Sequence, residues 1–166
     1  MTNNGPPFRA DHVGSLLRPP SLRQAYRDHR NGKATDASLA IAQDDSIREA
    51  IALQEAVGLE SITDGEFRRA SYWSSFVERV DGLDIKDAAF TFRDECGHEQ
   101  AFTAPHVSGP VRRQQAIAVD EFNFVRASTS QTPKTTLPSP PSMHFWRVDQ
   151  GIDKAVYPDA KSYFTD

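Results

Sequence analysis

The sequence has little cysteine, no long apolar run and no large charge of either sign. Cys96 is the only cysteine among 166 residues, which excludes an internal disulfide framework and predicts a reducing, cytoplasmic location. No apolar run approaches the roughly 20 residues that span a bilayer, and the N-terminus lacks the basic and then apolar pattern of a secretory signal. A net charge of −4 gives no electrostatic reason to expect nucleic acid or a membrane as a partner.

The chain also lacks a GxGxxG or Walker-type loop, which argues against a nucleotide-binding protein. Its 166 residues, 38% of them hydrophobic, are enough for one soluble domain with a core. Short apolar strands alternate with helices, which favours a parallel α/β sheet, either doubly wound or closed into a barrel. About three strands can be recognised, whereas a closed eight-stranded barrel needs about 250 residues, so a barrel here would be incomplete.

Local end signals divide the chain into elements. Residues 1–8 are polar and rich in proline and glycine, and we expect a flexible end there. Apolar spacing predicts helices over 21–31, 35–57 and 114–129, and further helices that begin near 70 and 159. Ser21 should cap the first helix, Thr35 or Asp36 the second, and Gly58 should end the second. Strands are expected near 9–13, over 59–63 and within 133–146.

Small and polar residues follow each predicted strand: Gly14-Ser15, Asp64-Gly65-Glu66 and Pro138-Ser139-Pro140. Ligands of parallel α/β proteins bind at the carboxyl ends of strands, because the loops converge there. Ser15 and its neighbouring amide could hold a carboxylate while Glu66 takes an ammonium, which together would recognise an amino acid. The alternative is a turn with Gly65 in a left-handed conformation and with solvated charges. Spacing alone leaves both interpretations open.

Three basic residues lie near these strand ends. Arg68 and Arg69 could hold Asp64 or Glu66 in place, or reach an anionic substrate tail, but such arginines are also common on surfaces. His12 could hydrogen-bond a ligand beside Gly14, or it could be a structural histidine. The pattern does not decide between these roles.

Residues 82–112 contain short alternating stretches and turn residues, which predict a β-hairpin excursion. Cys96 and His98 place two possible zinc ligands in this excursion, with His106 eight residues further on. Structural zinc normally needs four ligands in tetrahedral arrangement, and one cysteine with scattered histidines is a poor set. We therefore expect no metal site in this chain.

Three segments in order, "ADHVGSLLRP", "QEAVGLESITDGEFRRASYWSSF" and "TLPSPPSMHFW" with the following "YPDAKSYFTD", carry a family likeness. The sequence resembles the N-terminal part of the cobalamin-independent methionine synthase family, in its stand-alone catalytic-barrel form. The resemblance implies an incomplete TIM-like (β/α)8 barrel over 9–166, with about the first three βα units and the hairpin excursion. The family moves a methyl group from 5-methyltetrahydrofolate, usually polyglutamylated, to homocysteine, whose thiolate is bound by zinc.

By this resemblance, Gly14 and Ser15 hold the carboxylate of homocysteine and Glu66 binds its amino group. His12 and Asp64 are weaker candidates for the same pocket. Ser139 and His144 fall where the family approaches the folate.

The departures from the family concern the metal. The family's zinc ligands are a His-x-Cys pair, a Glu and a further Cys from later strands, and this sequence contains no His-x-Cys. We therefore expect zinc not to bind this chain, and the chain alone to be inactive. One alternative is a truncated remnant that docks onto a partner or self-associates through uncovered barrel edges. A second is a related zinc-thiol transferase acting on another thiol, such as coenzyme M, which would not need Glu66.

Overall fold

The computed structural model describes residues 11–166, so the expected flexible end at 1–8 lies outside the described residues. The chain separates into two compact units. Within the described residues, unit 1 comprises 11–69 and 118–136, and unit 2 comprises 70–117 and 137–166. Chain segments that are distant in sequence therefore meet inside each unit.

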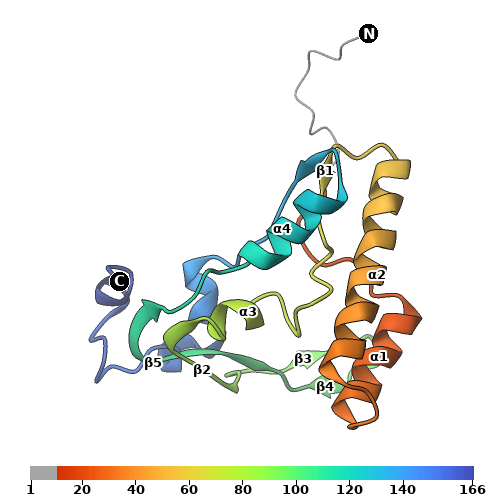
Figure 1. The fold of residues 1–166 in the computed structure, drawn as a ribbon. Coiled ribbons are helices and arrows are strands. Elements are labelled where there is room, and N and C mark those ends of the chain that lie inside the picture. The colour runs from red at the N-terminus through yellow and green to blue at the C-terminus, as the bar shows by residue number, and fades with distance from the viewer. Residues whose placement is uncertain (1–10) are drawn as a thin grey trace. The chain divides into compact units, whose positions relative to one another are not determined.

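Two helices form one side of unit 1, α1 (Pro20–Arg30) and α2 (Asp36–Ala56), which pack against each other (Figure 1). Thr35 caps α2 as predicted, because its side chain accepts a hydrogen bond from the Ser38 amide at 3.2 Å. The prediction of Ser21 as the cap of α1 is wrong. Pro19 occupies the cap position and Pro20 begins the helix, where a proline loses no hydrogen bond.

The rest of unit 1 consists of β1 (Ser61–Ile62), α4 (Val119–Ser128) and β6 (Thr132–Pro133). The two strands pair in parallel, with Ser61 opposite Thr132 and Ile62 opposite Pro133. The strand predicted over 59–63 is thus confirmed but shorter. The core side chains of this unit come from both helices, β1, the following loop and α4: Leu22, Ile47, Ala50, Ile51, Ile62, Phe67 and Val125.

The strand predicted near 9–13 is not found in its described part, 11–13. Val13, the residue on which that prediction depended, is 91% exposed. Instead of forming a ladder, the segment is tied to β1's loop through the Leu16 amide, which donates to the Gly65 carbonyl at 3.1 Å. One apolar residue between polar neighbours buries too little surface to define a strand face.

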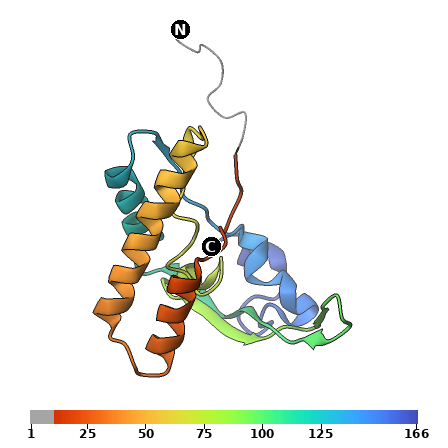
Figure 2. The same cartoon turned by 90° about the vertical axis from the view of Figure 1, so that its right-hand side faces the viewer.

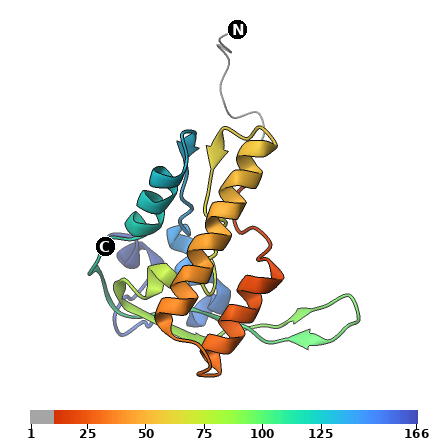
Figure 3. The ribbon, with the colours of Figure 1, turned by 45° about the vertical axis from the view of Figure 1, so that its right-hand side comes forward.

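Unit 2 contains α3 (Ser74–Val77) and an antiparallel pair, β2 (Val80–Asp87) and β5 (Thr103–Arg113). Figure 3 shows this pair continuing into a narrow hairpin made of β3 (Phe92–Arg93) and β4 (Glu99–Gln100). These strands occupy the range 82–112. The helix expected to begin near 70 starts later and is short.

The C-terminal part of unit 2 is built from short helices, η1 (Pro140–Met143), η2 (Phe145–Gln150) and α5 (Ala160–Tyr163) (Figure 2). The third strand ends at Pro133, the first residue of the predicted range 133–146, and 3-10 helices follow where prolines remove ladder donors. Asp159 caps α5 by accepting from the Ser162 amide at 2.7 Å. The core of the unit is aromatic and aliphatic: Trp73, Val77, Val80, Leu83, Val107, Met143, Tyr157 and Tyr163.

The described residues thus form a mixed α/β protein with three two-stranded sheets. The predicted α/β class is confirmed at this level. Among the described helices, none combines the length and the apolar character required to cross a bilayer.

Candidate functional site

The loop after β1 is the most unusual backbone of unit 1. Gly65 and Glu66 both have left-handed conformations, with φ values of 66° and 59°. A Cβ on Gly65 would lie 3.0 Å from the Cβ of Leu16. Glycine is therefore favoured there both by the left-handed backbone and by the lack of space for a side chain. A left-handed Glu66 costs free energy, of order 1–3 kcal/mol, and such strain is concentrated at functional sites.

The charges of this loop are buried. Asp64 is 4% exposed and Glu66 is 3% exposed. The turn alternative is therefore right about the left-handed Gly65 and wrong about solvated charges. Buried carboxylates persist only where the surrounding groups compensate for lost hydration.

Two hydroxyl groups hold the Glu66 carboxylate. Ser15 Oγ donates to Glu66 Oε2 at 2.6 Å, and Thr136 Oγ1 donates to Glu66 Oε1 at 2.6 Å. Gly14 lies beside the same carboxylate, since a Cβ built on it would be 3.7 Å from Oε1. The structure thus brings together the Gly14-Ser15 and Glu66 positions that the sequence singled out, which are more than 50 residues apart.

Arg69 and Glu121 form a buried ion pair beside this group. The Arg69 side chain is 1% exposed, and its Nη2 and Nε both donate to Glu121 Oε2, the latter at 2.9 Å. Burial alone would lower the pKa of Arg69, but the hydrogen bond and charge of Glu121 raise it. Arg69 Nη1 also donates to Thr136 Oγ1 at 3.1 Å and lies 3.8 Å from Glu66 Oε1.

Two buried carboxylates lie beside the Arg69 guanidinium. Among the described residues, Arg69 is the cation within ion-pair distance of both carboxylates, Glu66 and Glu121. Among the other nearby arginines that the structure describes, Arg18 donates to the backbone carbonyls of Glu66 and Arg69, and Arg68 pairs with Asp44. Glu66 and Glu121 therefore share one ion-pair partner, and a bound cation would give Glu66 a partner of its own.

Asp64 adds a third buried carboxyl. The Glu66 amide donates to Asp64 Oδ1 at 2.9 Å, whereas Oδ2 has no hydrogen-bond partner among the described residues. Burial raises the pKa of Asp64, against the lowering effect of the Glu66 amide. Asp64 therefore holds the turn that positions Glu66, and its carboxyl is easier to protonate than a solvated one.

His12 lies at the edge of this region. Burial lowers the pKa of His12, and the charge of Lys134 lowers it further. Lys134 Nζ donates to Asp11 Oδ1 at 2.5 Å and to the His12 carbonyl. His12 Nε2 has no partner among the described residues, so this nitrogen is able to accept or donate one hydrogen bond.

Two members of this site, Glu121 and Thr136, were not identified from the sequence. An acidic residue in the first turn of a helix, such as Glu121 in α4, is usually explained by the helix dipole. Thr136 lies three residues after the end of β6, where the strand-end rule would have drawn attention to it had the strand been placed at 132–133. Arg69 was considered as a partner of Asp64 or Glu66, and its main partner is Glu121.

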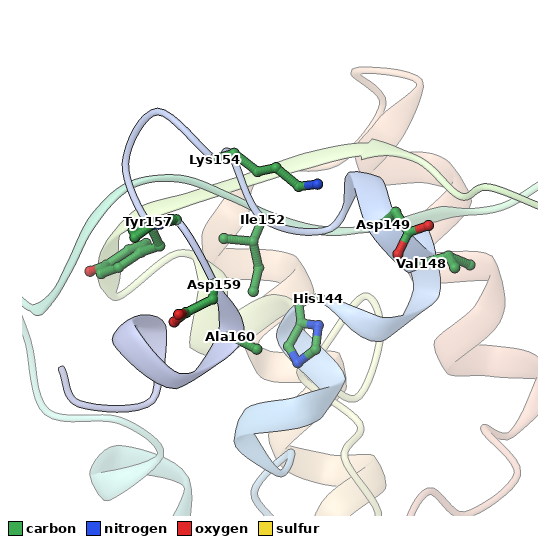
Figure 4. Close-up of a pocket in the computed structure, with 9 residues that line it drawn as sticks. His144, Val148, Asp149, Ile152, Lys154, Tyr157, Asp159 and Ala160 are labelled. Carbon is green, nitrogen blue, oxygen red and sulfur yellow. The ribbon is translucent and has the colours of Figure 1, made fainter.

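The two folate-side candidates belong to unit 2. Ser139 is exposed, with its hydroxyl 3.1 Å from that of Ser142. His144 lines a pocket of about 210 Å³, together with Asp149, Lys154 and Asp159 (Figure 4). Burial lowers the pKa of His144, and its Nε2 has no partner among the described residues.

Proteins of known sequence match nearly all of this chain, but the match covers only part of their own length. Residues 8–156 match the sequence profile described as cobalamin-independent synthase, catalytic domain. The uncharacterised protein YxjH of Bacillus subtilis is 32% identical over 163 residues, which cover 96% of this chain and 42% of that protein. The 5-methyltetrahydropteroyltriglutamate–homocysteine methyltransferase of a Synechococcus strain is 30% identical over 152 residues, which cover 87% of this chain and 19% of that protein.

A solved structure agrees with these relatives. The crystal structure of a Listeria monocytogenes protein, assigned as a vitamin-B12-independent methionine synthase, matches with a TM-score of 0.73 and 28% identity. The match covers 96% of this chain and 44% of that structure. The chain thus spans less than half the length of these three relatives. Since the profile covers most of the chain, the protein belongs to the cobalamin-independent methionine synthase family and corresponds to part of its catalytic domain.

Proposed function

We propose that unit 1 holds the amino-acid end of homocysteine in a methyl transfer that produces methionine. The observation that supports this is the buried Glu66 carboxylate, which is held by Ser15 and Thr136 and shares its nearest cation, Arg69, with Glu121. A substrate ammonium would give the Glu66 carboxylate an ion-pair partner of its own. The same carboxylate would have no counterpart on a thiol substrate without an amino group, such as coenzyme M.

Binding rearranges the hydrogen bonds of Glu66. The ammonium donates to the Glu66 carboxylate, and Ser15 Oγ turns from Glu66 toward the substrate carboxylate. Gly14 has no side chain, so the backbone of this segment can approach the substrate closely. Arg69 keeps its hydrogen bonds to Glu121 and Thr136. It therefore leaves the Glu66 carboxylate available to the substrate ammonium.

The chain's own residues do not fit the zinc ion that the family uses. The expected ligand set contains a His-x-Cys pair and a second cysteine, whereas this sequence has one cysteine, Cys96, which lies in unit 2. The side chains that contact Glu66 are hydroxyls and a guanidinium. A free thiol has a pKa of about 8.5 and stays mostly protonated at neutral pH. We therefore assign to this chain the holding of homocysteine and not the activation of its thiol.

The finer assignments are part of the same proposal. The parallel β1–β6 pair with intervening helices supports a partial (β/α) barrel. The Synechococcus relative is named for a folate methyl donor, and we propose 5-methyltetrahydrofolate, in polyglutamate form, as the donor. Ser139 and His144 are proposed to lie on the folate side.

Calorimetry with three ligands tests the proposal. L-homocysteine and L-methionine share the amino-acid end, whereas 4-mercaptobutyrate is homocysteine without its amino group. We expect the two amino acids to bind and 4-mercaptobutyrate to bind at least about tenfold more weakly, since a charge-assisted hydrogen bond contributes about 1.5–3 kcal/mol. In Glu66→Gln this preference should disappear.

The control variant is Glu78→Gln, the same change at an exposed position of unit 2. It should bind all three ligands as the unchanged protein does. Equal binding of homocysteine and 4-mercaptobutyrate by the unchanged protein would contradict the role of Glu66. Methyl transfer to homocysteine by this chain alone would contradict the division between holding and activation.

A further inference from the structure

The turn between β3 and β4 contains three different metal-binding side chains outside the site of unit 1. They are the alternate residues Asp94, Cys96 and His98, and their ligand atoms all lie within 4.8 Å of one another. Gly97, with φ of 82°, makes the tight turn that directs them to one side.

Only one ligand atom of the three side chains, Asp94 Oδ1, hydrogen-bonds the backbone of the turn. Asp94 Oδ1 accepts hydrogen bonds from the Cys96 and His98 amides, both at 2.9 Å. Asp94 Oδ2 remains for His98 Nδ1, at 3.1 Å, and the Cys96 thiol is free. All three residues are exposed, so packing of the core does not explain their presence.

The chemical nature of the three groups selects the ion. A thiolate, an imidazole and a carboxylate are the ligands that zinc and neighbouring divalent transition metals prefer, whereas magnesium and calcium prefer oxygen alone. Zinc bonds of about 2.0–2.3 Å place ligand atoms roughly 3–4 Å apart, a spacing these groups reach by side-chain rotation. Three protein ligands leave one position for water.

We propose that Asp94, Cys96 and His98 bind a divalent transition-metal ion, zinc foremost, at the tip of the hairpin of unit 2. The ligands differ in residue order and composition from the His-x-Cys, Glu and Cys set of the family. The site also departs from the expectation, drawn from sequence, that this chain binds no metal. It is independent of homocysteine binding by unit 1.

Cobalt substitution gives a direct test, because Cys96 is the only thiol in the chain. Titration of the reduced protein with Co²⁺ should produce a thiolate-to-cobalt charge-transfer band that saturates at one equivalent and is displaced by Zn²⁺. Any such band reports on Cys96. The band should be absent in Cys96→Ser.

The other two ligands are tested by Asp94→Asn and His98→Asn. Each should weaken cobalt and zinc binding about tenfold or more, since even residues that only support ligands change affinity by that amount. The matched control is His29→Asn, because His29 is likewise a surface histidine beside a carboxylate, that of Asp36 at 2.6 Å. It should bind both metals as the unchanged protein does.

Two results would overturn the proposal. One is the absence of a charge-transfer band in the folded, reduced protein. The other is an unchanged cobalt affinity in both Asp94→Asn and His98→Asn, which would reduce the site to a single surface thiol. Circular dichroism of each variant should be unchanged, because the three side chains are exposed.

Discussion

Two turns of this protein are similar in sequence chemistry and opposite in environment. In "TDGE" and in "DECGH", an aspartate accepts hydrogen bonds from backbone amides that follow it, and a glycine has a left-handed conformation. Asp64 is buried and its pKa is raised by burial, whereas Asp94 is exposed and its pKa is lowered, chiefly by the His98 amide. The same local motif thus gives opposite charge behaviour, because desolvation dominates in one turn and hydrogen bonding in the other.

The glycines of the two turns differ in the same way. A Cβ on Gly65 would lie 3.0 Å from Leu16, whereas a Cβ on Gly97 would meet nothing within 4 Å. The first turn is therefore constrained by its surroundings as well as by its backbone. The second is constrained by its backbone alone.

The largest expected effect comes from breaking the ion pair of the buried turn. Arg69→Met leaves Glu121 and Glu66 buried without their cation, and it should lower the free energy of unfolding by about 3–5 kcal/mol. Arg93→Met, the matched change at the exposed Arg93–Glu99 pair of the hairpin, should change little. Urea denaturation of both variants measures the difference. Equal losses would show that the burial of Arg69 has no energetic consequence.

The next effect concerns the two glycines. Gly65→Ala combines a left-handed backbone with a close contact, and it should destabilise by about 2 kcal/mol or more. Gly97→Ala has only the left-handed backbone and should cost about 1 kcal/mol. Thermal unfolding of both variants tests this order, and a larger loss for Gly97→Ala would contradict it.

The smallest effect is the pH dependence of the two aspartates. The folded pKa of Asp64 lies above its usual value of 3.8, so its contribution to stability is complete below that value and is lost as pH rises through the folded pKa. The folded pKa of Asp94 lies below 3.8, so its contribution is present above that value and is lost as pH falls through the folded pKa. Carboxyl carbon NMR titration, with a chelator present, should show the two displaced in opposite directions. Displacement in the same direction would refute the contrast.

Part of the site could be predicted from the sequence. Ser15 and Glu66 were identified because small and polar residues follow predicted strands, and the structure places their side chains 2.6 Å apart. This succeeded even though no strand forms at 11–13, because a loop tied to the β1 turn brings Ser15 to the same place. For Glu66 the strand-end rule holds, because β1 precedes it. For Ser15 the family resemblance carried the inference, because no strand forms at 11–13.

The sequence did not show that Glu121 and Thr136 meet Arg69 and Glu66, and the reason is physical. Their distance from Arg69 and Glu66 along the chain is 52 and 70 residues, and no local pattern records which distant residues meet. The environment of the Glu66 carboxylate depends on both residues, so it could not be described before the chain path was known. Which carboxylate pairs with Arg69 is likewise decided by how the unit packs.

The amino-acid sequence by itself indicated the local features: the Thr35 cap, the left-handed Gly65 and the α/β alternation. These depend mostly on interactions within a few residues, which a segment can form without contacts to the rest of the chain. Only the tertiary structure decided which of the two turns, that of Asp64 or that of Asp94, is buried. Burial is a property of surroundings assembled from distant segments, and it made one acidic turn a buried cluster of charges and left the other exposed to solvent.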